Sequence, residues 1–254
     1  MKKNNKIEIY IAAHKKFEVP KNDIYIPLHV GAFNKADLGF LKDSTKKNIS
    51  EKNSSFCELT GIYWIWKNVK ADIIGLVHYR RYFYNSVFNS KKKILTEKEI
   101  KNILNKYDII VAPKGYTLHT NVKNDYIKNH IEDDFIKCEE IIKNKYPDYM
   151  KAYNKIMNGN SYRQFNMIIT KKSIFNEYCS WIFDILLELE KNVDLDDGRN
   201  NYNKRVFGFL SERLFNVWLL KNNQYKIKEK CVFNTEESMI KQKIRFIIKK
   251  IIKG

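Results

Sequence analysis

Cysteine is scarce in this 254-residue sequence, and long apolar segments are missing. No Cys-x-x-Cys pair and no Cys/His spacing typical of a zinc site occurs. No apolar segment is long enough to span a bilayer. The short apolar run at residues 7–13 contains Glu8 and lacks a convincing cleavage site, which argues against a signal peptide. We therefore expect a cytoplasmic protein with reduced core thiols. The four cysteines are Cys57, Cys138, Cys179 and Cys231.

Two common nucleotide-binding motifs are also missing. Residues 7–13 are expected to form the first strand, which ends in a polar turn at His14. Neither G-x-G-x-x-G nor G-x-x-x-x-G-K-[ST] follows this strand, so the sequence has no dinucleotide fingerprint and no P-loop. A nucleotide would have to be held in another way.

Acidic residues are outnumbered, with 29 Asp and Glu against 47 Lys and Arg, which gives a net charge of +18. Such a charge indicates an anionic partner, namely a nucleotide, a nucleic acid or an anionic membrane surface. Part of it reflects a sequence rich in Lys, Asn and Ile throughout. The hydrophobic fraction of 44% and the length predict a globular chain with a sizeable core.

Strand and helix patterns alternate along the chain, which favours an α/β sheet. Buried-type strands are expected at residues 7–13, 72–79, 107–113 and 165–170. Helices are expected from Ser55 to about residue 68, after Thr96, and over residues 173–191.

Residues 53–83 contain the most informative pattern. Ser55 and Glu58 have the spacing of a helix capping box. The strand that follows runs directly into Arg80 and Arg81. Ligands of open α/β sheets bind just beyond the carboxyl ends of strands, and the forked donors of two guanidiniums suit a diphosphate. The alternative is an ion-paired strand end.

The motifs Glu58-Leu-Thr60, Tyr63-Trp-Ile-Trp-Lys-Asn68 and Gly75-Leu-Val-His-Tyr-Arg-Arg-Tyr-Phe83 resemble a bacterial family long described as a domain of unknown function. That family occurs in capsule and O-antigen gene clusters, and some members are galactofuranosyltransferases. The resemblance extends roughly over residues 9–219. It implies a single GT-A-like (Rossmann-type) domain that binds a nucleotide sugar, with added helices, over residues 1–235.

The resemblance and the residue chemistry together assign candidate site residues. Asn166 begins a buried strand and needs a partner, either a sugar hydroxyl or a turn of the backbone. The groups expected to bind the donor are His14, His78, Tyr79, Arg80, Arg81, Asn166 and Arg205.

A catalytic base is expected among the acidic residues. Tyr126, His130 and Asp134 are spaced by four, which predicts one helical face and an imidazole oriented by a carboxylate. The alternative is a surface His–Asp pair. Asp134, helped by His130, is the first candidate for the base, and Glu212 is the second. Glu212 lies among apolar neighbours, so it is either paired with an Arg in the core or presented to an active site.

Asp194-Leu-Asp196 is an Asp-x-Asp motif, a type that holds a metal ion in many sugar-nucleotide enzymes. It falls between two helices and not after a strand, so a helix cap or a loop is expected. We predict that no metal is required, with Mn²⁺ as the alternative, because guanidiniums occupy the position where a metal motif would be expected.

Residues 236–254 form a basic tail. Over residues 240–253 isoleucines share one helical face, lysines and an arginine share the other, and no acid is present. This pattern is typical of an interfacial helix on an anionic leaflet, and a terminal helix packed on the domain is the alternative.

The predicted function is transfer of a hexose from a UDP-sugar to a lipid-linked glycan, with inversion, in capsule, O-antigen or lipopolysaccharide synthesis. Galactofuranose or galactose is the expected sugar, and the inner face of the cytoplasmic membrane is the expected place. The alternative is a basic nucleic-acid-binding protein without catalysis.

Overall fold

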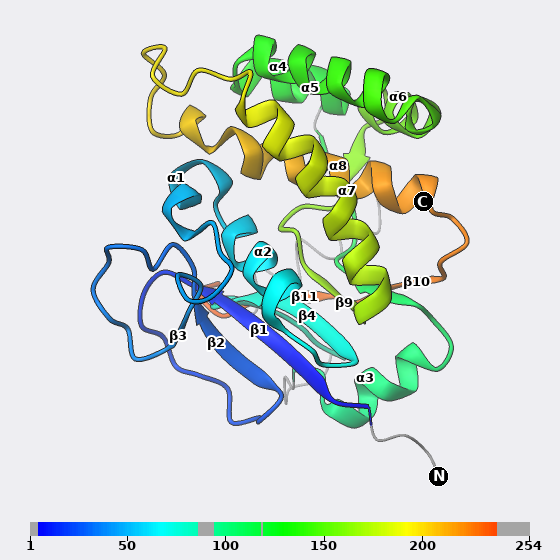
Figure 1. The fold of residues 1–254 in the computed structure, drawn as a ribbon. Helices are drawn as coiled ribbons and strands as arrows, with labels where there is room; N and C mark the ends of the chain where they lie inside the picture. Colours follow the sequence, from blue (N-terminus) through cyan, green and yellow to red (C-terminus); the bar gives the residue numbers. More distant parts are fainter. Residues whose placement is uncertain (1–4, 86–93, 118, 238–254) are drawn as a thin grey trace.

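The computed structural model describes residues 5–85, 94–117 and 119–237, and it shows helices stacked on a mixed sheet (Figure 1). In the sheet, β1, β2, β3 and β4 are mutually parallel, and β9 runs antiparallel to both of its neighbours. The strand order is β10-β6-β9-β4-β1-β2-β3. The strands on this path are β1 (Ile7–Ala13), β2 (Tyr25–His29), β3 (Leu41–Lys42), β4 (Ile73–His78), β6 (Ile109–Val111), β9 (Ile168–Lys171) and β10 (Ile227–Glu229).

A short antiparallel extension follows β4. The chain turns at residues 79–80 and returns as β5 (Arg81–Phe83), which pairs with β11 (Val232–Asn234). A separate two-stranded sheet consists of β7 (Gly115–Tyr116) and β8 (Ser161–Tyr162). The segment that carries Arg80 and Arg81 is therefore tied to the sheet on one side and to β11 on the other.

The helices cover the sheet unequally. Figure 1 shows α2 and α7 over one face of the sheet, with α4, α5 and α6 stacked farther out, and α3 lies at the other end of the molecule. The helices are α1 (Asn53–Phe56), α2 (Leu59–Asn68), α3 (Glu97–Leu104), α4 (Val122–Asn129), α5 (Glu132–Lys145), α6 (Met150–Met157), α7 (Lys172–Glu190) and α8 (Val206–Lys221). The described residues also form the 3₁₀ turns η1 (Ser50–Lys52), η2 (Pro147–Tyr149) and η3 (Asn203–Arg205).

Both faces of the central strands are buried, as their dense apolar runs predict. In β4, Ile74 and Leu76 belong to the core beneath the helices, and Ile73 and Val77 belong to the core on the opposite face. A Cβ on Gly75 would lie 2.7 Å from side-chain atoms of Ile169 and Ile9, so only glycine allows β4 to pack this closely.

Thr96 begins α3 as predicted. Its hydroxyl accepts from the backbone N–H of Glu99, and the Glu99 carboxylate accepts from the backbone N–H of Thr96. This is the reciprocal capping box that satisfies two otherwise unpaired donors. The expected helix at residues 173–191 is α7, within one residue at each end.

The predicted capping box at Ser55 and Glu58 is wrong. The segment is two helices, because Cys57 has a left-handed backbone (φ +52°) and separates α1 from α2. The Ser55 hydroxyl donates to the carbonyl of Lys52, and Glu58 makes no capping hydrogen bond. The carboxylate of Glu58 is used elsewhere, as described below.

Candidate active site

A cleft lies beyond the carboxyl ends of β1 and β4, where the parallel arrangement brings the two strand ends together. It has a volume of about 580 Å³, in the range of small-molecule sites. Its lining comes from the ends of β1 and β4, from α1 and its junction with α2, and from the turn before β9 and the start of α8. The lining residues are Ala12, His14, Val30, Asn53, Ser54, Cys57, Glu58, His78, Tyr79, Arg80, Arg81, Phe165, Arg205 and Glu212.

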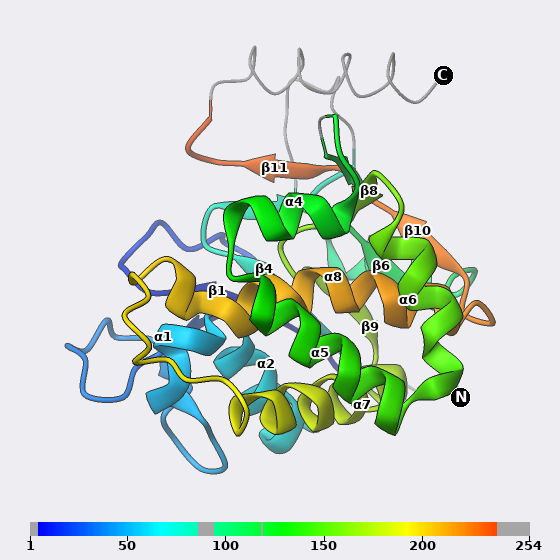
Figure 2. The same ribbon diagram turned by 90° about the horizontal axis from the view of Figure 1, so that it is seen from above.

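Three arginines reach this cleft from two segments. Arg80 comes from the turn after β4, Arg81 begins β5, and Arg205 directly precedes α8. The start of α8 lies beside α1 (Figure 2), and the Nε of Arg205 donates to the Sγ of Cys57 over 3.2 Å. Burial lowers the pKa of Arg81, with the neighbouring Arg80 as a further cause. Crowding of like charges of this kind favours an anion in the cleft.

The two arginines of the turn have different partners. The guanidinium of Arg81 lies 4.3 Å from the ring centre of Phe165. Arg80 donates to Glu236 over 2.9 Å, and its buried Nε has no hydrogen-bond partner among the described residues. The pairing with Glu236 thus leaves the hydrogen-bonding capacity of Arg80 incompletely used.

Two histidines, His14 and His78, line the cleft, and burial favours the neutral form of both rings. The pKa of His14 is lowered, mainly by burial and then by Lys15 and Arg80. The pKa of His78 is also lowered, and burial is again the main cause. The Nε2 of His78 lies 2.7 Å from the carbonyl oxygen of Phe165. Because a carbonyl only accepts, Nε2 carries the proton and Nδ1 is left as an acceptor.

Two carboxylates, Glu58 and Glu212, face the same cleft. Burial, and secondly the charge of Glu58, raise the pKa of Glu212 to about 7. Glu212 accepts a hydrogen bond from the backbone N–H of Phe165 over 2.9 Å. Its other oxygen accepts none from the residues that the structure describes. A carboxyl group that titrates near neutral pH suits a general base.

The turn before β9 connects these groups. Phe165 (φ +80°) and Asn166 (φ +49°) both have left-handed backbones, which cost an estimated 1–3 kcal/mol each for such residues. Phe165 contacts Glu212 through its N–H and His78 through its carbonyl. The strained turn therefore holds Glu212 of α8 and His78 of β4 in one arrangement.

Asn166 lies directly behind the cleft lining. Its Nδ2 donates to Glu58 over 2.9 Å and to the hydroxyl of Ser211 over 2.8 Å. Its buried Oδ1 has no partner within the described part of the chain. The sequence predicted a donor-binding role, and the structure places this side chain against Glu58 instead of in the lining.

The sequence analysis missed a buried acid, Asp43, which supports the wall of the cleft. Its carboxylate accepts from the N–H groups of Gly31 and Ala32 at 2.8 and 3.0 Å, and from the hydroxyls of Ser50 and Thr60 at 2.5 and 2.6 Å. This side chain is fully buried. Gly31, Ala32 and Ser50, from two separate segments, thus order around a carboxylate of the protein itself.

The predicted helical face of Tyr126, His130 and Asp134 is wrong. The chain breaks at residues 130–131, so Tyr126 belongs to α4 and Asp134 to α5. His130 stacks on Phe209 with ring centres 4.1 Å apart. Neither His130 nor Asp134 lines the cleft.

Asp134 is committed to a buried ion pair. Its two oxygens accept from the two terminal nitrogens of Arg199 at 2.8 and 3.1 Å, and both side chains are only 2% exposed. Because the side chain is almost fully buried and already holds a guanidinium, Asp134 is not accessible to a substrate. Glu212, the second candidate, is the acid that reaches the cleft.

The Asp-x-Asp motif lies in the loop between α7 and η3. Asp194 accepts from the backbone N–H of Asp196, and Asp197 holds the guanidinium of Arg199. This arrangement matches the loop alternative. Within residues 5–85, 94–117 and 119–237, no group of three or more His, Cys, Asp or Glu side chains could hold a metal ion.

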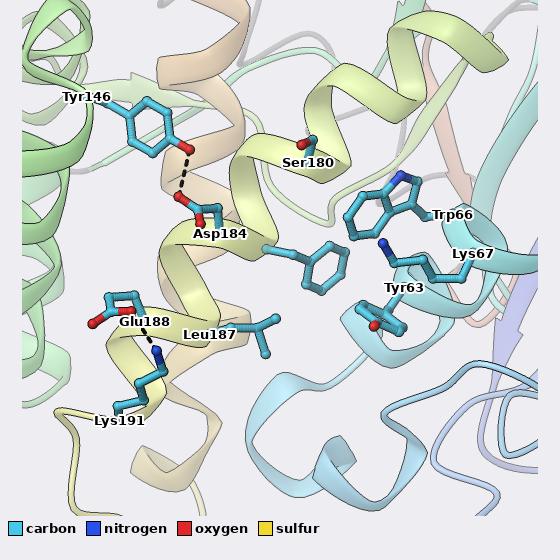
Figure 3. A pocket seen from close by; sticks show the side chains of 10 residues that line it. Tyr63, Trp66, Lys67, Tyr146, Ser180, Asp184, Leu187, Glu188 and Lys191 are labelled. Carbon is cyan, nitrogen blue, oxygen red and sulfur yellow. Dashed lines mark hydrogen bonds and ion pairs between the residues drawn. The ribbon is translucent and has the colours of Figure 1, made fainter.

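A second pocket of about 520 Å³ lies between α2 and α7 (Figure 3). Trp66 stacks on Phe183 there, and the ammonium of Lys67 lies 3.1 Å from the Trp66 ring centre. Its acids already have partners: Asp184 accepts from Tyr146, and Glu188 accepts from Lys191. It has none of the converging arginines that mark the first cleft.

Comparison with known proteins agrees with this arrangement. The family model for a domain of unknown function, DUF4422, matches residues 8–224. The chain belongs to the DUF4422 family. No curated protein matches. A solved structure, the apo form of the bifunctional glycosyltransferase WbbM, is similar to this DUF4422 protein with a TM-score of 0.84 and 30% identity.

The similarity covers 92% of this chain and 46% of the WbbM chain, so the DUF4422 protein spans about half the length of that structure. The expected GT-A-like fold is confirmed by this match and by the mixed, mostly parallel sheet. None of the helices that the structure describes is both long and apolar enough to cross a membrane.

Proposed function

We propose that this DUF4422 protein is a glycosyltransferase that uses a nucleoside diphosphate sugar. One observation carries the proposal: Arg80, Arg81 and Arg205 converge on one cleft with the half-buried carboxyl of Glu212. Cations stabilise the charge that develops on a leaving diphosphate, and a carboxylate accepts the proton of an attacking hydroxyl. The similarity to a glycosyltransferase structure supports the same reaction class.

The proposed roles follow from the geometry. The acceptor oxygen attacks the anomeric carbon, and its proton passes to Glu212. The bond from that carbon to the diphosphate oxygen breaks, and its electron pair leaves with the nucleoside diphosphate. Arg80 and Arg81 bind the leaving diphosphate, with His14 and Arg205 at its border. A single displacement of this kind inverts the anomeric configuration.

The finer assignment rests on the sequence. We propose a UDP-hexose donor, with galactofuranose or galactose as the sugar, and a lipid-linked glycan acceptor. The tail at residues 240–253 would hold the protein on the inner face of the cytoplasmic membrane, and it lies outside the described residues. No metal is assigned a role, because arginines occupy the position that faces the diphosphate.

Nucleic-acid binding is not favoured. Arg80, Arg81 and Arg205 converge within one cleft, beside two carboxylates that would repel a nucleic-acid phosphate backbone. A binder of single strands instead presents a groove with aromatic rings free to stack on bases. Here Tyr79 and Phe165 are covered by Lys15 and Arg81 respectively.

A thermal-shift titration with UDP, with and without Mn²⁺, tests the donor site. A ligand that binds only the folded state at about 100 times its Kd should raise the Tm by roughly 5–10 °C. We expect this shift without metal, and we expect Arg80→Ala/Arg81→Ala to abolish it. In an assay of UDP release from UDP-galactose or UDP-galactofuranose, either single variant should lose on the order of 10²-fold in rate.

The control is Lys98→Ala/Lys143→Ala, which removes two exposed positive charges from α3 and α5. It should bind UDP as the unmodified protein does. Retention of the full shift by the double arginine variant would exclude the proposed site. A shift that requires Mn²⁺ would instead direct attention to Asp194, Asp196 and Asp197.

A further inference from the structure

Glu58 and Glu212 are brought together by the strained turn at Phe165 and Asn166. Phe165 donates its N–H to Glu212 over 2.9 Å, and Asn166 donates its side-chain amide to Glu58 over 2.9 Å. Adjacent residues of one rigid turn thus hold two carboxylates from two different helical segments. The second carboxylate has no role in the reaction proposed above.

We propose that Glu58 is a positioning residue whose negative charge, fixed by Asn166, makes Glu212 an effective proton acceptor. This inference rests on the proposed transfer reaction, in which Glu212 is the base. The carboxylate of Glu58 acts through its electrostatic field, while Glu212 exchanges the proton.

Local backbone structure directs Glu58 into the cleft. The left-handed residue Cys57 separates α1 from α2 and turns the chain just before Glu58. A glutamate near a helix start commonly binds backbone N–H groups of that helix. Glu58 forms no such bond and lies in the cleft lining instead.

Asn166 is itself held in place, which fixes the donor that binds Glu58. Its Nδ2 also donates to the hydroxyl of Ser211, and that hydroxyl donates to the carbonyl of Gly208. Asn166 is 2% exposed, so water does not compete for these bonds. Glu58 therefore has one defined position relative to α8, the helix that carries Glu212.

Charged and titratable side chains from several elements influence the ionisation of Glu212. Glu58 is the anion that opposes its ionisation, and Arg205 and Arg213 favour it. Arg81 faces it from the start of β5, and Cys57 and Tyr162 are further titratable neighbours. His78, at the end of β4, lines the same cleft and has Glu58 as its main carboxylate influence.

The arginine nearest in sequence is directed away from Glu212. Arg213 donates to the carbonyl of Phe209 and to Asp125 at 3.0 Å each. Glu58 is thus the neighbour whose removal should change the proton affinity of Glu212 most, because the carboxylate of Glu212 has no direct ion pair among the described residues.

The variant Glu58→Gln isolates the charge. Glutamine keeps the shape of the side chain and an oxygen that accepts from Asn166, so the turn and the fold are retained. The measurement is a carboxyl ¹³C NMR titration of protein labelled with [5-¹³C]glutamate. The signal of Glu212 is the one that Glu212→Gln removes. Glu51→Gln, an exposed change in η1, is the matched control.

We expect the titration midpoint of Glu212 to fall by about one pH unit or more in Glu58→Gln, and to stay unchanged in Glu51→Gln. One unit corresponds to about 1.4 kcal/mol between protonation states. The acidic limb of the pH profile for UDP release from UDP-galactose should move by the same amount, with a lower rate at its plateau.

An unchanged midpoint for Glu212 in Glu58→Gln would overturn the inference. So would complete loss of UDP release at every pH with that midpoint unchanged, because Glu58 would then be the base itself. Failure of the proposed function is a different result: the unmodified protein would then release no UDP from either donor, while the NMR midpoints could still be measured.

Discussion

The carboxylate of Glu236 lies on the guanidinium of Arg80, with 2.9 Å between Oε2 and a terminal nitrogen. Its other oxygen lies 3.2 Å from the ammonium of Lys15. Glu236 belongs to the segment after β11 and not to the cleft lining. An acidic side chain of the protein thus already pairs with Arg80, the arginine that we propose binds the donor diphosphate, and so competes with that ligand.

Replacing Glu236 with glutamine should therefore strengthen UDP binding. The pair is partly exposed, with side-chain exposures of 38% and 43%, so solvent screens it and the Kd should fall by no more than roughly 5-fold. Isothermal titration calorimetry with UDP measures it. Glu97→Gln in α3 is the control, and a weaker Kd in Glu236→Gln would show that the pair orients Arg80 for the ligand.

Asp134 should prove structural. Arg199→Ala leaves a buried carboxylate unpaired and should lower the free energy of unfolding by about 3–5 kcal/mol, as measured in urea. Asp134→Asn should lower stability as well, yet the folded protein should bind UDP and release it from UDP-galactose at an unchanged rate. Loss of UDP release from a folded Asp134→Asn protein would restore the catalytic assignment of Asp134.

Asp43→Asn should destabilise the protein by about 2–4 kcal/mol. The new amide group would place N–H donors against the donors of Gly31, Ala32, Ser50 and Thr60, which leaves buried polar groups unpaired. Urea unfolding measures the change, and Asp23→Asn, an exposed substitution, is the control. Equal stability of the two variants would mean that water or a shift of the loop replaces these bonds.

His130 should make the protein sensitive to acid. Burial, and secondly Arg213, lower its pKa to about 4 from an ordinary value near 6.5. The folded state thus favours the neutral ring. The contribution of His130 to the free energy of unfolding is fully present above pH 6.5 and is lost as the pH falls toward 4. Because the ring is partly exposed, the free energy of unfolding should fall by about 1–2 kcal/mol over this pH range.

Urea unfolding between pH 4 and 7 measures this dependence. His130→Phe keeps a ring that can stack on Phe209 and should flatten the profile, whereas His119→Asn at an exposed position should not. An identical pH slope in His130→Phe would assign the acid sensitivity to other groups.

The strand ends were predictable from the sequence because their signals are local. A dense apolar run marks β4, and Arg80 and Arg81 follow it directly, so the strand-end rule placed them correctly. His14 was placed by the same rule at the end of β1. Their roles as donor ligands stay predictions.

The partners of the acids were not predictable, because they are distant in sequence. Glu58 has the spacing of a capping box, but its partner Asn166 is 108 residues away. Asp134 has a helical spacing to His130, but its partner Arg199 is 65 residues away. A short-range sequence pattern does not reveal such partners, because the contacts form only when the folded sheet brings distant segments together.

Asp43 had no signal at all in the sequence. An isolated aspartate in a polar stretch is usually solvated, and only the folded loop surrounds it with four donors. The left-handed residues Cys57, Phe165 and Asn166 were equally hidden, because none is glycine and tertiary contacts alone hold them there.

The pairing of β11 with β5 bears on how the protein can be shortened. Asn234 pairs with Arg81 and Val232 with Phe83, and the N–H of Thr235 donates to the carbonyl of Arg80 over 2.9 Å. A truncation that removes the basic tail should therefore retain residues up to 237. Cutting before β11 would strip the backbone partners from both arginines, and a loss of activity would then be mistaken for a requirement for the membrane.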